Sequence, residues 1–246
     1  MPLHLGRSPT VGASIAEVHG ASRLPVSQLR MAGSRRSFIL SVFAAVFAVS
    51  GVSVIAVALV AQDDAPQPPP SAAGNLEPSL LGPRAVSTDQ VLPESAPIAI
   101  EIPAIGVQSK LQYVGLTPEN TMEVPQPGPH YDEAAWYKYS PPPGSRGSAV
   151  IVGHVDSVDG GPSVFFKLGD MGPGDEVRVR RADGHVAVFV VDGVRSFPKD
   201  PFPGLLVYGD TGQATLRLIT CGGGFDDTTG HYLENIVVFA TLVDIL

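Results

Sequence analysis

Apolar and polar residues alternate with a period of two in short segments of the second half of the chain. Isoleucine occupies every second position of 98–102, and valines alternate with charged side chains in 175–181. This alternation predicts half-buried strands. The Asp183-Gly184 pair that separates the second segment from the apolar run 185–191 predicts a β-hairpin.

Three further apolar runs, 148–153, 214–220 and 235–242, also predict strands because they are rich in β-branched residues. The first run is continuously apolar, which favours a strand buried on both faces. After residue 61 no stretch holds a long helical period, although a short turn over 132–137 is compatible with the sequence. Many short strands joined by Gly and Pro predict an all-β barrel or sandwich, here over residues 96–246.

A charge-free run of 24 residues, 38–61, precedes this domain. As a helix it would extend roughly 36 Å, enough to cross a bilayer. The apolar part of a cleaved signal peptide is usually shorter, about 7–15 residues, so a retained transmembrane anchor over 37–61 is favoured. Arg35 and Arg36 before the run and Asp63 and Asp64 after it predict a cytoplasmic N-terminus and an extracellular domain.

The two flanking segments differ in composition. Residues 1–36 carry five arginines against one glutamate and predict a short cytoplasmic tail, and Met31 is an alternative start of translation. Residues 62–95 are rich in Pro, Ala, Ser and Gly, and too few apolar side chains are present to offset the entropy of ordering. We therefore expect a disordered linker between anchor and domain.

Composition excludes several classes of protein. The net charge of −8 argues against a nucleic-acid partner, because such domains are usually basic. The single cysteine excludes an internal disulfide framework and a cysteine-rich zinc site. No cofactor and no metal are expected.

The single cysteine and one histidine follow two of the predicted buried strands. Cys221 ends the run LRLIT and opens a glycine tripeptide, and His154 follows SAVIVG. A free thiol is mostly protonated at neutral pH, so a nucleophilic cysteine needs a base such as imidazole nearby. Two other interpretations are an inert core cysteine and a metal site of His154, Asp156 and Cys221, which lacks the usual ligand spacing of zinc sites.

Eight sequence segments occur in the same order as in a known family. They are IPAIGV (102–107), TMEVP (121–125), GSAVIVGHVDS (147–157), GPSVFFKL (161–168), PGDEVRV (173–179), FPKDPFP (197–203), LRLITCGGGFD (216–226) and NIVVFAT (235–241). The chain resembles the sortases of Gram-positive bacteria, and within them the class E/F group of actinobacteria. The resemblance implies a closed eight-stranded barrel with short helical turns.

The resemblance also implies an activity. Sortases are cysteine transpeptidases that cleave an LPxTG-like sorting signal of a surface protein through an acyl-thioester and transfer the protein to an amine of the peptidoglycan precursor. It makes Cys221 the nucleophile and His154 the general acid/base, with a membrane, surface proteins and the wall precursor as partners. The alternative is a degenerate barrel that binds wall or surface-protein peptides without cleaving them.

One departure from the family favours that alternative. Sortases place an arginine on the strand after the cysteine, near the position of Leu233, to stabilise the oxyanion, and here no Arg or Lys follows Cys221. Removal of an oxyanion donor costs about 2.7–4 kcal/mol of transition-state stabilisation. Two groups of residues could replace it. The first comprises Gly222, His231, Tyr232 and Asn235, and the second comprises Arg195 and Arg217.

Overall fold

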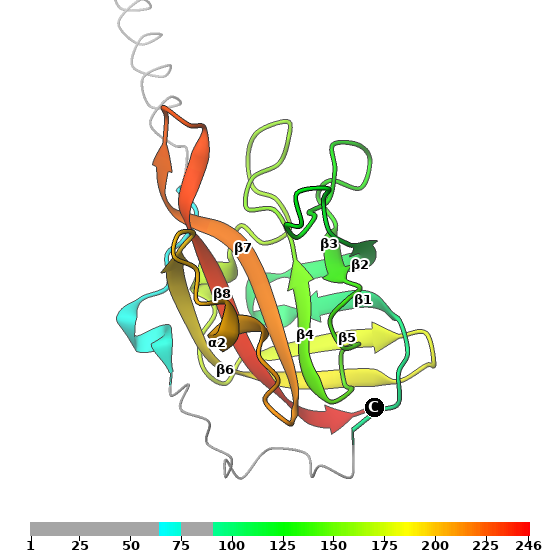
Figure 1. The fold of residues 1–246 in the computed structure, drawn as a ribbon. Coiled ribbons are helices and arrows are strands. Elements are labelled where there is room, and N and C mark those ends of the chain that lie inside the picture. The colour runs from blue at the N-terminus through cyan, green and yellow to red at the C-terminus, as the bar shows by residue number, and fades with distance from the viewer. Residues whose placement is uncertain (1–63, 75–90) are drawn as a thin grey trace, which may run out of the picture. The chain divides into compact units, whose positions relative to one another are not determined.

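Eight strands close into a barrel in the computed structural model, which describes residues 64–74 and 91–246 (Figure 1). The strands are β1 (Pro97–Ile102), β2 (Val107–Val114), β3 (Ala134–Tyr137), β4 (Gly147–Val152), β5 (Glu176–Arg181), β6 (Val186–Pro198), β7 (Ala214–Asp226) and β8 (His231–Ile245). The described helices are short: η1 (Pro70–Ala73), η3 (Pro103–Ile105), η4 (Leu168–Asp170) and α2 (Gly204–Tyr208). The predicted closed eight-stranded barrel is confirmed.

The order of strands around the barrel is β1-β2-β3-β4-β7-β8-β6-β5. β2 pairs with β3 and β4 pairs with β7 in parallel, and the other neighbours pair antiparallel. The chain therefore brings β6 and β7, which are consecutive in sequence, to opposite sides of β8. This order decides which side chains meet around the cysteine.

The predicted hairpin is present as β5 and β6, which are joined through Asp183 and Gly184. Gly184 has a φ of 91°, a left-handed conformation that glycine adopts without steric cost. The second strand is longer than the apolar run predicts. β6 continues past a bulge near Gly193 and ends at Pro198, so its far end reaches the end of the barrel where β7 carries the cysteine.

All six residues of β4 are buried, as the unbroken apolar run predicts. Ala149 and Ile151 contribute to the core inside the barrel. Val150 and Val152 face outward and join a second cluster that includes Val207 of α2. β4 is thus covered on both faces and is held rigidly at the point where the candidate histidine follows it.

Residues 64–74 lie against the barrel, whereas the composition predicts disorder for the whole stretch 62–95. Ala65 and Ala72 are buried, and the carbonyl oxygen of Pro66 lies so close to Gly169 that a Cβ there would be 1.9 Å from it. The difference has a physical reason. This segment is held by close approach of backbone to glycines, which a count of apolar residues does not detect.

Residues 91–96 are also fixed before the first strand. The amide of Leu92 donates to the carbonyl of Gly144 at 2.8 Å, and the Arg181 guanidinium donates to the carbonyl oxygens of Pro93 and Pro143. The Arg181 side chain is fully buried and also bonds Asp183. The buried arginine therefore fastens the entry of the chain to the β5–β6 hairpin.

Two further expectations concern a helical turn over 132–137 and a transmembrane anchor over 37–61. The segment 132–137, compatible with a helical turn by sequence, contains strand β3 instead, because Ala134 to Tyr137 pair with β2 and β4. The predicted anchor over 37–61 lies outside the described residues. Within 64–74 and 91–246, no helix has the length and apolarity needed to cross a bilayer.

Candidate active site

The cysteine and the histidine are brought together by the parallel pairing of β4 and β7. Val152 pairs with Ile219, and beyond the end of β4 the amide of Gly153 still donates to the carbonyl of Ile219 at 3.1 Å. Because the pairing is parallel and in register, His154 and Cys221 occupy the next positions on neighbouring strands. Both therefore lie where β4 ends beside β7, and Figure 1 shows these two strands side by side.

Cys221 is a free, half-buried thiol. It pairs with Asn235 across β8, and it packs against a small buried cluster of Ala65, Val155 and Phe166. Val155 is the residue after His154, so this cluster is a second link between β7 and the loop that follows β4. A thiol with one packed side and one solvent-facing side can be reached by a substrate, unlike a sealed core cysteine.

Close contacts and backbone conformation explain why glycines, and not larger residues, follow the cysteine. A Cβ on Gly222 would lie 2.7 Å from the Ile236 side chain, and Gly223 has a φ of 74°. The amide of Gly223 donates to the Gln67 side chain at 3.0 Å. The glycine run thus lets β7 shift its register against β8 just after the thiol, and it accepts the segment 64–74 against it.

His154 is oriented by the loop between β2 and β3. Its Nε2 lies 2.8 Å from the carbonyl oxygen of Pro125, and its ring stacks on Tyr131. A carbonyl oxygen can only accept, so Nε2 carries the hydrogen of this bond. In the neutral ring Nδ1 is then the free acceptor, which is the form needed to take a proton.

Polar side chains connect the loops that surround the two residues. Asp132 accepts hydrogen bonds from Ser157 at 2.9 Å and from Ser163 at 2.7 Å. The Tyr232 hydroxyl donates to Asp156 at 2.6 Å. These bonds tie β8 and the β2–β3 loop to the loop that follows His154.

The two tyrosines remain neutral over the ordinary pH range. Burial raises the pKa of Tyr131, and the charges of Asp132 and Asp156 add to that effect. Burial also raises the pKa of Tyr232, together with its bond to Asp156. Both phenols therefore act as packing and hydrogen-bonding groups here.

A lysine that the sequence analysis did not consider also contacts the cysteine. The Nζ atom of Lys199 lies 3.5 Å from the Sγ atom of Cys221. Lys199 belongs to the FPKDPFP segment after β6, which the motif comparison identified but which gives no sign of proximity to the thiol. The sequence would have indicated this contact only if β6 and β7 were already known to lie on opposite sides of β8.

The four residues of the first group that could replace the oxyanion arginine differ in their distance from the thiol and in their partners. The Tyr232 hydroxyl is engaged by Asp156, and His231 is exposed where β8 begins, paired with Asp226. Gly222 and Asn235 remain close to the thiol by strand register. Tyr232 and His231 are therefore weaker candidates than Gly222 and Asn235.

Neither candidate arginine serves the thiol. Arg195 donates to the carbonyl of Ala73 at 3.3 Å. Arg217 is buried beside α2, where it donates to the Val207 carbonyl at 3.1 Å and lies over the Phe239 ring. Burial lowers the pKa of Arg217 to about 10.

The metal alternative finds no support in the geometry. Asp156, the carboxylate it requires, bonds Tyr232. In the part of the chain that the structure describes, no three His, Cys, Asp or Glu side chains are grouped to hold a metal ion. Asp226 accepts bonds from Thr228 and Thr229 of its own turn, which lower its pKa.

Comparison with known proteins decides the family. The family model described as the sortase domain matches residues 100–243. The chain belongs to the sortase family. It is accordingly a cysteine transpeptidase of the sortase type, an enzyme that cleaves sorting signals. No curated protein matches the sequence.

Solved sortase structures are similar to this chain. A lid mutant of sortase A from Corynebacterium diphtheriae is 19% identical, with a TM-score of 0.46 over 62% of this chain and 73% of that one. A second structure of the same sortase A is 20% identical, with a TM-score of 0.45 over 61% and 62%. A sortase D5 transpeptidase from Clostridium perfringens is 18% identical, with a TM-score of 0.44 over 61% and 79%.

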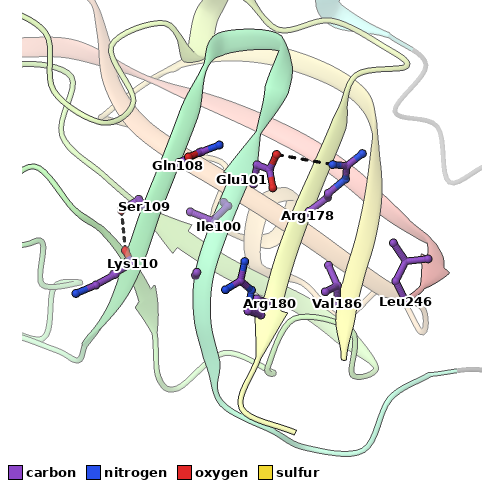
Figure 2. A pocket seen from close by; sticks show the side chains of 10 residues that line it. Ile100, Glu101, Gln108, Ser109, Lys110, Arg178, Arg180, Val186 and Leu246 are labelled. Carbon is purple, nitrogen blue, oxygen red and sulfur yellow. Dashed lines mark hydrogen bonds and ion pairs between the residues drawn. The ribbon is translucent and has the colours of Figure 1, made fainter. Parts of the chain in front are cut away.

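The sortase domain also has hollows on its surface. A groove of about 440 Å³ runs along β1, β2 and β5. Arg178 lies 3.7 Å from Glu101 there, and Lys110 and Arg180 also line the groove (Figure 2). Among the described residues, no cysteine or histidine lines it. A hollow of about 590 Å³ adjoins the glycine run instead, lined in part by Gln67 and Tyr232.

Proposed function

We propose that Cys221 is the nucleophile and His154 the general acid/base of this sortase. One observation carries the proposal: His154 follows β4 and the chain's single cysteine lies within the adjacent parallel strand β7 at the matching register position, with the thiol half-exposed. Both residues also lie within the matched domain. The packing of Cys221 against Val155 supports the same assignment.

The reaction then proceeds in two balanced halves. His154 Nδ1 takes the thiol proton, and the sulfur attacks the threonine carbonyl carbon of an LPxTG-like signal, so that a C–S bond forms and the carbonyl electron pair moves to oxygen. When the pair returns, the C–N bond breaks and the leaving amine takes the proton from His154. An acyl-thioester remains on Cys221, and the C-terminal fragment departs.

The second half transfers the acyl group to an amine, for which we propose the peptidoglycan precursor. Its nitrogen gives a proton to His154 and attacks the thioester carbon. The C–N bond forms, the C–S bond breaks, and the sulfur regains a proton. The surface protein is then joined to the wall precursor by an amide.

The proposal includes a location and a subgroup. The apolar run 37–61, with arginines before it and aspartates after it, supports a single-pass anchor with the barrel outside the cell. Enzyme and sorting-signal substrates would then share one membrane. The segment LRLITCGGGFD (216–226) supports membership of the class E/F group.

The test uses the full chain and fluorogenic LPxTG and LAxTG peptides. We expect Cys221→Ala to abolish cleavage and labelling by a methanethiosulfonate reagent. His154→Ala should lower kcat by roughly 10²–10⁴-fold with the thermal midpoint nearly unchanged. Full cleavage by the Cys221 variant would remove the nucleophile assignment. Peptide binding without any cleavage by the wild type would favour the degenerate barrel.

A further inference from the structure

We propose that Lys199 supplies the positive charge that stabilises the Cys221 thiolate and the oxyanion formed on the attacked carbonyl. The inference rests on the proposed role of Cys221 and adds a catalytic residue to it. Lys199 contacts the reacting atom itself, since its Nζ lies 3.5 Å from Sγ. Residues 222–246 contain no Arg or Lys, whereas Lys199 comes from the segment that follows β6.

Strand register explains how the lysine reaches the thiol. Asn235 of β8 pairs with Cys221 on one side and with Phe197 of β6 on the other, so the three side chains share one face. Lys199 comes two residues after Phe197, just past the end of β6, and its amide still bonds the Leu233 carbonyl of β8. The alternation of side chains along a strand therefore returns Lys199 to that face. Two strand spacings separate β6 from β7, about 10 Å, which the long lysine side chain crosses above β8.

A hydrogen bond to β8 fixes the backbone of Lys199 beside the thiol. The Lys199 amide donates to the carbonyl of Leu233 at 3.1 Å. The Leu233 side chain is exposed and uncharged, so it does not compete with the lysine for the thiol.

No competing partner holds the ammonium group. Within 64–74 and 91–246, Lys199 forms no ion pair with a carboxylate. The nearest acidic side chain on β8, Glu234, instead accepts a hydrogen bond from Ser196. The ammonium is therefore directed to the sulfur.

The chemical role follows from the contact. A thiolate is the nucleophilic form, and a nearby cation favours it over the thiol. When the C–S bond forms, the negative charge develops on the oxygen of the carbon bonded to that sulfur, and so within reach of the same ammonium. Lys199 keeps its protons throughout, while His154 carries the proton between sulfur and leaving amine.

The experiment compares four variants of the full chain. Lys199→Met removes the charge and keeps the stem, and Lys199→Arg keeps the charge. Lys199→Met combined with Leu233→Arg restores a cation from β8. Lys110→Met is the control, because Lys110 is an exposed lysine of β2, and β3 and β4 lie between β2 and β7. Two measurements are made on each variant. The first is the rate at which iodoacetamide alkylates Cys221 at neutral pH, and the second is kcat and KM for cleavage of the peptides.

We expect Lys199→Met to slow alkylation and to lower kcat by roughly 10²–10³-fold with little change in KM, as for loss of an oxyanion donor. Lys199→Arg and the Leu233→Arg combination should each recover at least a tenth of the wild-type rate. The thermal midpoint should stay unchanged, because the side chain is exposed.

The inference is overturned if Lys199→Met alkylates and turns over as fast as Lys110→Met while Cys221→Ala remains inactive. That result would leave the proposed function intact. Cleavage by Cys221→Ala would instead remove the proposed function itself. The alkylation rate tests the contact between Lys199 and Cys221 independently of the peptide chosen.

Discussion

The phenol ring of Tyr131 lies flat on the imidazole of His154, with ring centroids 4.0 Å apart and planes within 6° of each other. The same imidazole is bonded to Pro125 of the same loop. Stack and hydrogen bond together leave the ring one orientation, with Nδ1 free to accept a proton. The β2–β3 loop therefore positions the proposed acid/base, although it contributes no reacting atom.

Replacing Tyr131 by alanine should misplace the imidazole. We expect Tyr131→Ala to lower kcat roughly 10- to 100-fold with a smaller effect on KM, because small misplacements of a catalytic group are costly. Tyr131→Phe should stay close to wild type, since the ring is kept and the phenol is neutral at working pH. Peptide cleavage kinetics measure both.

The control for this pair is Tyr139→Ala. Tyr139 is an exposed tyrosine whose ring meets Tyr137 rather than an imidazole. Its loss should leave kcat unchanged. Equal rates for Tyr131→Ala and Tyr139→Ala would show that the stack does not hold His154.

Local patterns in the sequence predict most of the barrel. The alternation in β1 and β5, the Asp-Gly turn and the apolar run of β4 each depend on residues within a few positions, and each is present as expected. Cys221 and His154 stand out for the same reason, because each follows an apolar run of the sequence, although β7 continues past Cys221 to Asp226. The resemblance to sortases joins them into one site.

Long-range geometry accounts for what the sequence does not predict. Lys199 precedes Cys221 by 22 residues and meets it only because β8 inserts between β6 and β7. The search for a cation in the sequence after the cysteine therefore missed it. The docking of 64–74 is equally hidden, because small residues and glycines on distant segments hold it.

That docking gives a prediction about Gly169. A Cβ at this position would lie 1.9 Å from the Pro66 carbonyl oxygen, so Gly169→Ala should push the segment 64–74 off the barrel. We expect a stability loss of about 1–3 kcal/mol and faster hydrogen exchange in 64–74 and at the Gly223 amide, which loses Gln67. Exchange mass spectrometry and thermal unfolding measure these changes.

Gly172→Ala is the matched control, because a Cβ there meets no atom within 4 Å. It should change neither quantity. If hydrogen exchange in residues 64–74 is as slow in Gly169→Ala as in wild type, the close approach of Pro66 to Gly169 is not what holds the segment on the barrel.

The ion pair of Arg181 and Asp183 gives a prediction about acid stability. The Arg181 side chain is fully buried and its Nη2 lies 2.9 Å from Asp183 Oδ2. Its hydrogen bond is the largest cause that lowers the pKa of Asp183 below the ordinary value of 3.8. The unfolded chain therefore binds a proton at higher pH than the folded chain does, and stability falls as pH decreases.

The sign of this effect can be tested with Asp183→Asn. The pair stabilises the fold fully above the ordinary pKa, so at pH 7 the variant should melt several degrees below wild type. The difference should shrink as the pH falls below 3.8, because the unfolded wild type then binds a proton on Asp183 while the folded wild type still keeps its carboxylate charge. Asp159→Asn, at an exposed loop position, is the control and should melt with wild type at pH 7. A gap between Asp183→Asn and wild type that stayed constant from pH 7 to pH 2 would mean that charge on Asp183 does not hold the buried arginine.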